Sequence, residues 1–175
     1  MTQRDADEFT AFVAASSPSL RRTAYLMCGD WDAAADRVQE ALIRVYRAWP
    51  RLQRDGRLMA YARSALVSVV IDAGRKRSSR EVPVAMIRDQ ASDEDLAVGL
   101  AERDVLRRCL SVLGPRQRAC VVLRHYEDLP VSDVAAILGC SEGTVRSQTA
   151  RGLATLATAW ARETGESLVT SGGER

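Results

Sequence analysis

The chain has 175 residues, of which 46% are hydrophobic, 27% are charged and 5% are aromatic, and its formal net charge is +2. This composition is typical of a globular protein with an aliphatic core, and it argues against a disordered chain. No apolar run reaches the roughly 18 residues of a transmembrane helix, and the polar, acidic N-terminus argues against a signal peptide. We therefore expect a cytoplasmic protein without membrane insertion.

The cysteines and the single histidine do not indicate a metal site or a catalytic centre. The four cysteines stand at positions 28, 109, 120 and 140, without a C-x-x-C pair, whereas a zinc site needs three or four closely spaced ligands. No nucleophile-elbow or phosphate-loop motif accompanies His125. We expect no metal, no cofactor and no enzymatic activity, and we expect the cysteines to be small buried apolar groups.

Charge is distributed unevenly along the chain. Residues 1–80 carry 14 basic and 9 acidic side chains, residues 81–104 carry 2 and 7, and residues 105–175 carry 9 and 7. The acidic stretch contains a proline and lacks helical periodicity up to Asp93, which is typical of a linker. The pattern predicts a first domain at 1–80, a flexible acidic linker at 81–95, a second domain at 96–162 and a disordered tail at 163–175.

Apolar residues at helical spacing predict three helices in the first domain. The first lies around 18–28, the second spans 34–49, and the third, at 58–72, is apolar on almost all sides and therefore buried. The core-facing stripe of the second helix consists of Ala34, Val38, Ala41, Leu42, Val45 and Trp49. We expect these helices to form a small bundle.

The opposite face of the second helix combines charged residues with one large apolar residue. It holds Asp36, Gln39, Glu40, Ile43 and Arg47. An outward isoleucine among charged side chains is compatible with a docking face for a partner protein. The pattern alone is equally compatible with a helix face that is only solvated.

The third helix runs into a basic cluster formed by Arg75, Lys76 and Arg77. Cations are favoured at a helix C-terminus by the helix dipole, which is a structural explanation of the cluster. The same cluster is also suited to contacts with nucleic-acid phosphates.

Beyond the linker, apolar spacing predicts a helix over 105–113 and, after Gly114-Pro115, a second helix that ends near Tyr126. The expected core residues of this pair are Val105, Leu106, Cys109, Leu110, Val112, Leu113, Cys120, Val122, Leu123 and Tyr126. With the bundle of the first domain, these helices predict an all-α fold of two small domains.

Residues 130–156 have the pattern of a helix-turn-helix, PVSDVAAILGCSEGTVRSQTARGLATL. Gly139 suits the left-handed conformation that ends a helix, and Ser141 is a good N-cap for the next one. The outward arc of the second helix holds Arg146, Ser147, Ala150 and Arg151. Arginine can bind guanine O6 and N7 together, and a small residue admits a thymine methyl. A structural helix pair with a solvated face is the alternative, but the combined features favour DNA binding.

These segments resemble a bacterial RNA polymerase sigma factor of the extracytoplasmic-function group, over about residues 8–160. The resemblance to regions 2.1 and 2.2 rests on RTAYLMCGDWDAAADRVQEALIRVYRAW, and that to regions 2.3 and 2.4 on RSALVSVVIDAGRKRSSREVP. The resemblance to region 4 rests on LGPRQRACVVLRHYEDLPVSDVAAILGCSEGTVRSQTARGL. The family implies two helical domains and an initiation factor that directs core RNA polymerase to promoters.

The resemblance also implies partners and site residues. The polymerase β′ coiled coil would bind Asp36, Gln39, Glu40 and Arg47, the β flap would pack on the helices of 105–126, and an anti-sigma factor is a possible further partner. A loop at 52–60 would capture a flipped base of the −10 element. The implied −10 residues are Leu52, Arg63, Ser68, Arg75, Lys76 and Arg77. The implied −35 residues are Ser141, Thr144, Arg146, Ser147, Ala150 and Arg151.

The sequence departs from the common pattern of the family at three places, one of which is Ala73-Gly74, where bulkier, often basic residues are usual. Ser68 stands where many relatives have asparagine, and Leu52 stands where an aromatic residue is common. The alternative function is a stand-alone transcriptional regulator with a helix-turn-helix output domain. That alternative accounts for the helix-turn-helix pattern at residues 131–153. It accounts neither for the face from Asp36 to Arg47 nor for the basic end of the third helix.

Overall fold

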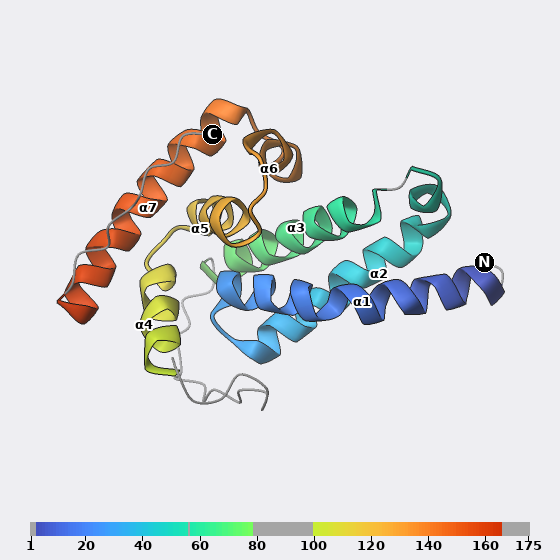
Figure 1. Cartoon of the computed structure of the whole chain (residues 1–175), viewed down its shortest axis with the longest axis horizontal. Helices are drawn as coiled ribbons and strands as arrows, with labels where there is room; N and C mark the ends of the chain where they lie inside the picture. The colour runs from blue at the N-terminus through green and yellow to red at the C-terminus, as the bar shows by residue number, and fades with distance from the viewer. Residues whose placement is uncertain (1–2, 56, 79–99, 166–175) are drawn as a thin grey trace. The chain divides into compact units, whose positions relative to one another are not determined.

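The computed structural model describes residues 3–55, 57–78 and 100–165 (Figure 1). Every regular element in these ranges is a helix, which confirms the prediction of an all-α fold. The chain divides into two compact units, the first with the helices of residues 3–78 and the second with most of those between residues 100 and 164. The predicted linker at 81–95 lies outside the described residues, as does the chain beyond Gly165.

The first unit is built from three long helices, α1 (Gln3–Cys28), α2 (Trp31–Asp55) and α3 (Leu58–Ser78). Consecutive helices run in opposite directions, and α2 packs against both of the others (Figure 1). The stripe predicted for α2 lies in the core, where only Leu42 of its six residues is partly exposed. The buried core consists of Leu20, Ala24, Ala34, Val38, Ala41, Val45, Trp49, Leu52, Ala62, Ala65 and Leu66. The burial of this stripe leaves the opposite face of α2 to solvent.

The first helix is much longer than its predicted span around 18–28, because it begins at Gln3 and contains Pro18 in its interior. Its N-terminal half is polar, but Phe9 and Phe12 pack against Trp49 of α2, with ring centroids 5.0 and 5.7 Å apart. Most helix stability in proteins comes from such tertiary packing rather than from local propensity. The apolar spacing of 18–28 alone therefore underestimated this helix.

The prediction of a loop at residues 52–60 is wrong. Helix α2 continues through Asp55 and α3 begins at Leu58, so that most of this segment is helical. Leu52 is only 4% exposed and belongs to the core. It lies three residues after Trp49 on the same side of the helix, and this continued apolar stripe explains why Pro50 does not end α2.

The second unit contains α4 (Leu100–Ser111), α5 (Pro115–Val121), the π-helical turn η1 (Val122–Tyr126), α6 (Val131–Leu138) and α7 (Glu142–Thr164). The long helix α7 packs against both α4 and α5. The buried hydrophobic residues of this unit are Cys109, Leu110, Leu113, Ala119, Cys120, Val121, Val122, Leu123, Val134, Ala135 and Val145. The core is thus aliphatic, as the composition suggested.

Two residues expected in this core are exposed instead. Val112 is 58% exposed because it follows Ser111, the last residue of α4, and no longer obeys helical spacing. Tyr126 is 47% exposed, and it lies in the π-helical turn, where the amide of Glu127 donates to the carbonyl of Val122 at 3.1 Å. A π turn inserts an extra residue and so rotates the following side chains by about 100°. Tyr126 therefore leaves the apolar side of the predicted helix.

Helix α7 approaches α5 closely at Gly152. A Cβ atom at this position would lie 2.7 Å from Cγ2 of Val121 and 3.5 Å from the carbonyl oxygen of Gln117. Val121 is buried and β-branched, so its methyl group cannot easily move aside. A side chain at position 152 would therefore force α5 and α7 apart.

We expect Gly152→Ala to destabilise the second unit. Overpacking costs about 1–3 kcal/mol, while alanine in a helix interior regains about 1 kcal/mol relative to glycine, so the net loss should reach about 2 kcal/mol. Urea unfolding followed by circular dichroism measures this change in the free energy of unfolding. In a Val121→Ala background the obstructing methyl is absent, and the same substitution should be neutral or stabilising. Equal destabilisation in both backgrounds would contradict the close approach.

The last helix ends at a glycine that the sequence analysis had placed inside the tail. Gly165 has φ 73°, and its amide donates to the carbonyl of Ala161 at 2.9 Å. Glu163 and Thr164 are consequently the last residues of α7 rather than the beginning of a disordered tail. Gly165 is the first residue after Arg162 that adopts the left-handed conformation without strain.

Candidate functional site

The turn between α6 and α7 has the geometry of a capped helix-turn-helix. Gly139 has φ 61°, and the amide of Cys140 donates to the carbonyl of Ala135 at 3.1 Å. The hydroxyl of Ser141 accepts a hydrogen bond from the amide of Thr144 at 3.1 Å. Both the left-handed glycine and the serine cap are confirmed, and together they fix the start of α7.

The residues of α7 divide into a buried and an exposed face as predicted. Val145 and Gly152 are buried, and the other apolar-side residues Thr149, Leu153, Leu156 and Trp160 are half-buried. The four residues of the outward arc are all exposed, namely Arg146, Ser147, Ala150 and Arg151. Two guanidinium groups, a hydroxyl and a methyl group are therefore presented on one accessible helix face, which is the chemistry that a major groove requires.

The two arginines of this face differ in their surroundings. Arg146 donates from Nη2 to Oε2 of Glu142 at 2.8 Å, one helical turn away, and both side chains are largely exposed. Arg151 has no ion pair among the described residues. Sequence reasoning missed Glu142, although its spacing of four residues from Arg146 was visible. A surface pair of this kind contributes at most about 1 kcal/mol, so Arg146 can exchange Glu142 for another partner.

The face of α2 opposite the core is exposed along its length. Asp36, Gln39, Glu40, Ile43 and Arg47 are all accessible, and Ile43 is 51% exposed. The sequence analysis did not single out Tyr46, which adds a ring that is 45% exposed. A face that combines Asp36 and Glu40 with two large exposed apolar side chains is suited to a protein partner that carries basic residues.

A hydrogen-bonded chain connects this face of α2 with α3. Arg44 donates from Nη2 to Oε1 of Glu40 at 2.9 Å and from Nη1 to the hydroxyl of Ser68 at 3.3 Å. The Ser68 hydroxyl in turn lies 3.5 Å from Oδ2 of Asp72. Sequence reasoning missed Arg44, because the contact to Ser68 joins two helices and no local pattern reveals it.

The residues expected at the −10 element are not all brought together. Ser68 is exposed and Arg63 is half-buried, but Leu52 lies in the core and cannot contact DNA in this conformation. Arg75, Lys76 and Arg77 belong to the last part of α3, and their side chains lie outside the described residues. The structure thus corrects the position of Leu52 and adds Arg44 as a neighbour of Ser68.

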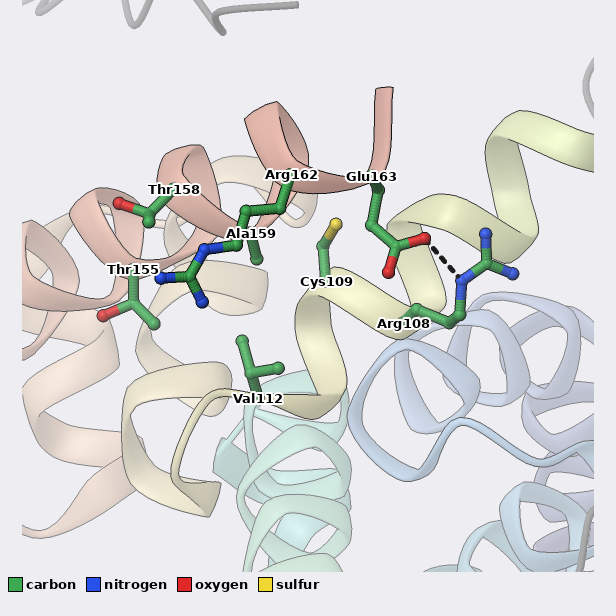
Figure 2. A pocket seen from close by; sticks show the side chains of 8 residues that line it. All are labelled: Arg108, Cys109, Val112, Thr155, Thr158, Ala159, Arg162 and Glu163. Carbon is green, nitrogen blue, oxygen red and sulfur yellow. Dashed lines mark hydrogen bonds and ion pairs between the residues drawn. The ribbon is translucent and has the colours of Figure 1, made fainter. Parts of the chain in front are cut away.

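A groove of about 410 Å³ lies between α4 and α7 (Figure 2). Arg108 donates from Nε to Oε2 of Glu163 at 2.9 Å, and this ion pair joins the two helices at one side of the groove. Cys109 and the exposed Val112 supply apolar lining from one side, and Ala159 supplies it from α7. The remaining lining residues are Thr155, Thr158 and Arg162. The groove can accept an apolar side chain beside a cation.

Two of the four cysteines, Cys109 and Cys120, are buried apolar groups as expected, whereas Cys28 and Cys140 are partly exposed. Cys109 and Cys120 are each 1% exposed, and burial, with a smaller contribution from Cys140, raises the pKa of the Cys120 thiol to about 11. A thiol with this pKa is protonated at neutral pH, unlike the thiolate that binds metals. Within the described ranges, no three ligating side chains are grouped for a metal ion, and no helix is long and apolar enough to cross a membrane.

Comparisons with known proteins agree with this arrangement. Residues 12–80 match the family model "Sigma-70 region 2", and residues 103–156 match "Sigma-70, region 4". The RNA polymerase sigma-E factor of Streptomyces avermitilis is 37% identical over 149 residues, which cover 85% of this chain and 83% of the relative. The sigma-E factor of Streptomyces coelicolor is 36% identical over a match that covers 85% of this chain and 84% of the relative. The sigma factor SigM of Mycobacterium tuberculosis is 29% identical over a match that covers 79% of this chain and 69% of the relative.

The fold is also shared with a solved structure. A chain in the co-crystal structure of the sigma factor RpoE with the anti-sigma factor NepR, from Bartonella quintana, matches with a TM-score of 0.67. The match covers 87% of this chain and 96% of the other, and the identity of 24% supports the fold alone.

Two helical units, one with an exposed acidic helix face and one with a capped helix-turn-helix, define a factor of bacterial transcription initiation. The chain belongs to the RNA polymerase sigma factors of the extracytoplasmic-function group. It is therefore a promoter-specific initiation factor rather than a stand-alone helix-turn-helix regulator.

Proposed function

We propose that this chain binds core RNA polymerase through its first unit and directs the enzyme to promoters through contacts of both units with DNA. The observation that carries the proposal is the outward face of α7, where two exposed arginines follow a fixed serine cap. The functional domains proposed are 1–80 for polymerase docking and the −10 element, 81–95 as a linker, and 96–162 for the −35 element.

Polymerase docking is assigned to Asp36, Gln39, Glu40 and Arg47 on α2. Their side chains are exposed on the face that does not contribute to the core, so they can contact a partner without unfolding the bundle. The acidic pair Asp36 and Glu40 is complementary to a basic helical surface, for which the β′ coiled coil is the proposed partner. Ile43 and Tyr46 add the apolar contact area that gives an interface its affinity.

Recognition of the −35 element is assigned to the start of α7. In the proposed complex Arg146 and Arg151 enter the major groove, and Ser147 and Ala150 lie between them against base edges or phosphates. Ser141 and Thr144 lie at the helix N-terminus, where their hydroxyl groups can bind a phosphate. For the −10 element the proposed residues are Ser68, Arg63, Arg75, Lys76 and Arg77, without Leu52.

The second unit offers a further protein-binding surface. The groove between α4 and α7 exposes Val112 beside Arg162, and it is the proposed seat for an apolar side chain of the polymerase β flap. An anti-sigma factor, a partner of the Bartonella quintana protein, is a proposed regulator of this chain as well. We infer in addition that the protein works in the cytoplasm and has no catalytic activity of its own.

Co-purification with core RNA polymerase tests the proposed function. The tagged full-length chain should retain the core subunits in stoichiometric amounts, and the assembled complex should start transcripts that core polymerase alone does not. The variant Arg4→Gln changes an exposed arginine of α1 that is not among the proposed contact residues, so it serves as a control and should behave as the wild type. A chain that binds promoter DNA tightly without core polymerase, and that retains no core subunits, would instead be a stand-alone regulator.

A further inference from the structure

The carboxylate of Glu142, beside Arg146, has no role in the −35 assignment. Glu142 is the first residue of α7, and its Oε2 accepts a hydrogen bond from Nη2 of Arg146 at 2.8 Å. The two side chains are 49% and 63% exposed, so the pair lies on the surface that is proposed to face DNA. A carboxylate on such a surface is repelled by phosphates, and its place beside an arginine that is proposed to read a base calls for an explanation.

Two structural explanations of this pair do not involve DNA. A negative charge is favoured at a helix N-terminus by the helix dipole, and an ion pair between residues four apart stabilises a helix slightly. The start of α7 is already fixed, however, because Ser141 accepts from the amide of Thr144 at 3.1 Å and Val145 is buried in the core. The fold of this helix therefore depends little on Glu142.

The geometry of the pair leaves Arg146 able to bind a guanine. A guanidinium group has five N–H donors, and Nη2 carries two of them, one on each forked edge of the group. Glu142 contacts Arg146 through Nη2, so one edge with two donors stays available for O6 and N7 of a guanine. The same contact restricts the rotation of a long side chain, and a group that is held in its binding position loses less entropy when it binds.

We propose that Glu142 is a positioning residue for −35 recognition, which holds Arg146 toward a base edge and away from the phosphates. This inference rests on the proposed function and deepens it by giving one further residue a role in specificity. Arg151, the other arginine of the outward arc, has no ion pair in the described part of the chain, so it is not subject to the same constraint.

The charge of Glu142 discriminates between the two kinds of DNA contact. A phosphate on the remaining edge of Arg146 would bring a second anion beside the Glu142 carboxylate, whereas the edge of a guanine is uncharged. The pair therefore disfavours contacts of Arg146 with phosphates at wrong sequences more than its contact with a guanine at the cognate sequence. Such a difference between two affinities is specificity.

The test measures binding of the holoenzyme, reconstituted from core polymerase and the full-length chain, to a cognate promoter and to promoters with single −35 substitutions. Glu142→Gln should reduce the preference for the cognate base at one −35 position about three- to fivefold, the range that a surface ion pair supports. The reduction should come from tighter binding of the wrong promoters. Asp133→Asn, at an exposed acid of α6, has the same change of charge and should leave the preference at every position unchanged.

Double variants separate the holding of Arg146 from a simple effect of charge. In the Arg146→Ala background, Glu142→Gln should leave the −35 preference unchanged, because no guanidinium group remains to be held. In the Arg151→Ala background, the effect of Glu142→Gln should persist in full. Tighter binding of all promoters alike in both backgrounds would overturn the inference, since it would report only the removal of a negative charge.

Further outcomes separate a failure of this inference from a failure of the proposed function. A Glu142→Gln variant that loses helix by circular dichroism but keeps the wild-type −35 preference would overturn the inference and assign the pair a structural role. Loss of the preference with Arg146→Ala but not with Glu142→Gln would overturn the inference alone. An Arg146→Ala variant that keeps the preference would refute the −35 role of Arg146 in the proposed function.

Discussion

Replacement of Arg146 or Arg151 by alanine should lower transcription from a cognate promoter while the contacts of the first unit stay intact. A base-specific contact by arginine contributes about 1–3 kcal/mol of discrimination, which is roughly a 5- to 150-fold effect. Both side chains are exposed on α7, so their removal should not disturb the core of the second unit. Transcription by the reconstituted holoenzyme from a series of −35 variants measures the effect.

The pattern across promoter variants distinguishes two kinds of contact. Loss of a base contact relaxes the preference at one position of the −35 element, whereas loss of a phosphate contact weakens all promoters alike and lowers the salt slope by about one. We expect at least one of the two variants to relax the preference. Arg162→Ala, near the end of the same helix and in the groove proposed for the β flap, is the control for base recognition: it should retain the wild-type −35 preference whatever its effect on overall transcription. If both variants at the start of α7 keep that preference too, this face does not recognise the element.

Reversal of charge at Asp36 and Glu40 should weaken assembly with core polymerase by tenfold or more. Like charges across an interface cost several kcal/mol, so two lysines facing a basic partner repel it. The fold should survive, because both residues are exposed and the ion pair of Glu40 with Arg44 is a surface pair with a contribution of at most about 1 kcal/mol. Fluorescence titration of labelled protein with core polymerase gives the affinity.

The matched control for this reversal lies on α1. Asp7 and Glu8 are exposed acids outside the α2 face, and their replacement by lysine changes the net charge by the same amount. The control variant should bind core polymerase nearly as well as the wild type. Equal losses in both double variants would mean that overall charge, rather than the α2 face, governs assembly.

Local patterns predicted those parts of the molecule that depend on neighbouring residues of one helix. The stripe of α2, the left-handed Gly139 and the serine cap at Ser141 follow from spacing and from backbone preferences, and the structure has all of them. The division of α7 into a buried side and an outward arc was visible for the same reason. These features position the candidate −35 residues.

Features that depend on contacts between helices could not be predicted in this way. The start of α1 depends on Phe9 packing against Trp49 of α2, forty residues later in the chain. The exposure of Tyr126 depends on a π-helical turn for which the apolar spacing gave no indication. The hydrogen bond of Arg44 to Ser68 joins α2 and α3, and no spacing along either helix reveals it.

The most direct test of the account compares transcripts made by core polymerase with and without this chain on a library of genomic DNA fragments. The account predicts new transcript starts that appear only with the chain and that share two sequence elements, near −10 and near −35. The Arg146→Ala and Arg151→Ala variants should alter the shared −35 element and leave the −10 element recognisable. New starts without a shared −35 element, or no new starts despite tight binding of the chain to DNA alone, would contradict it.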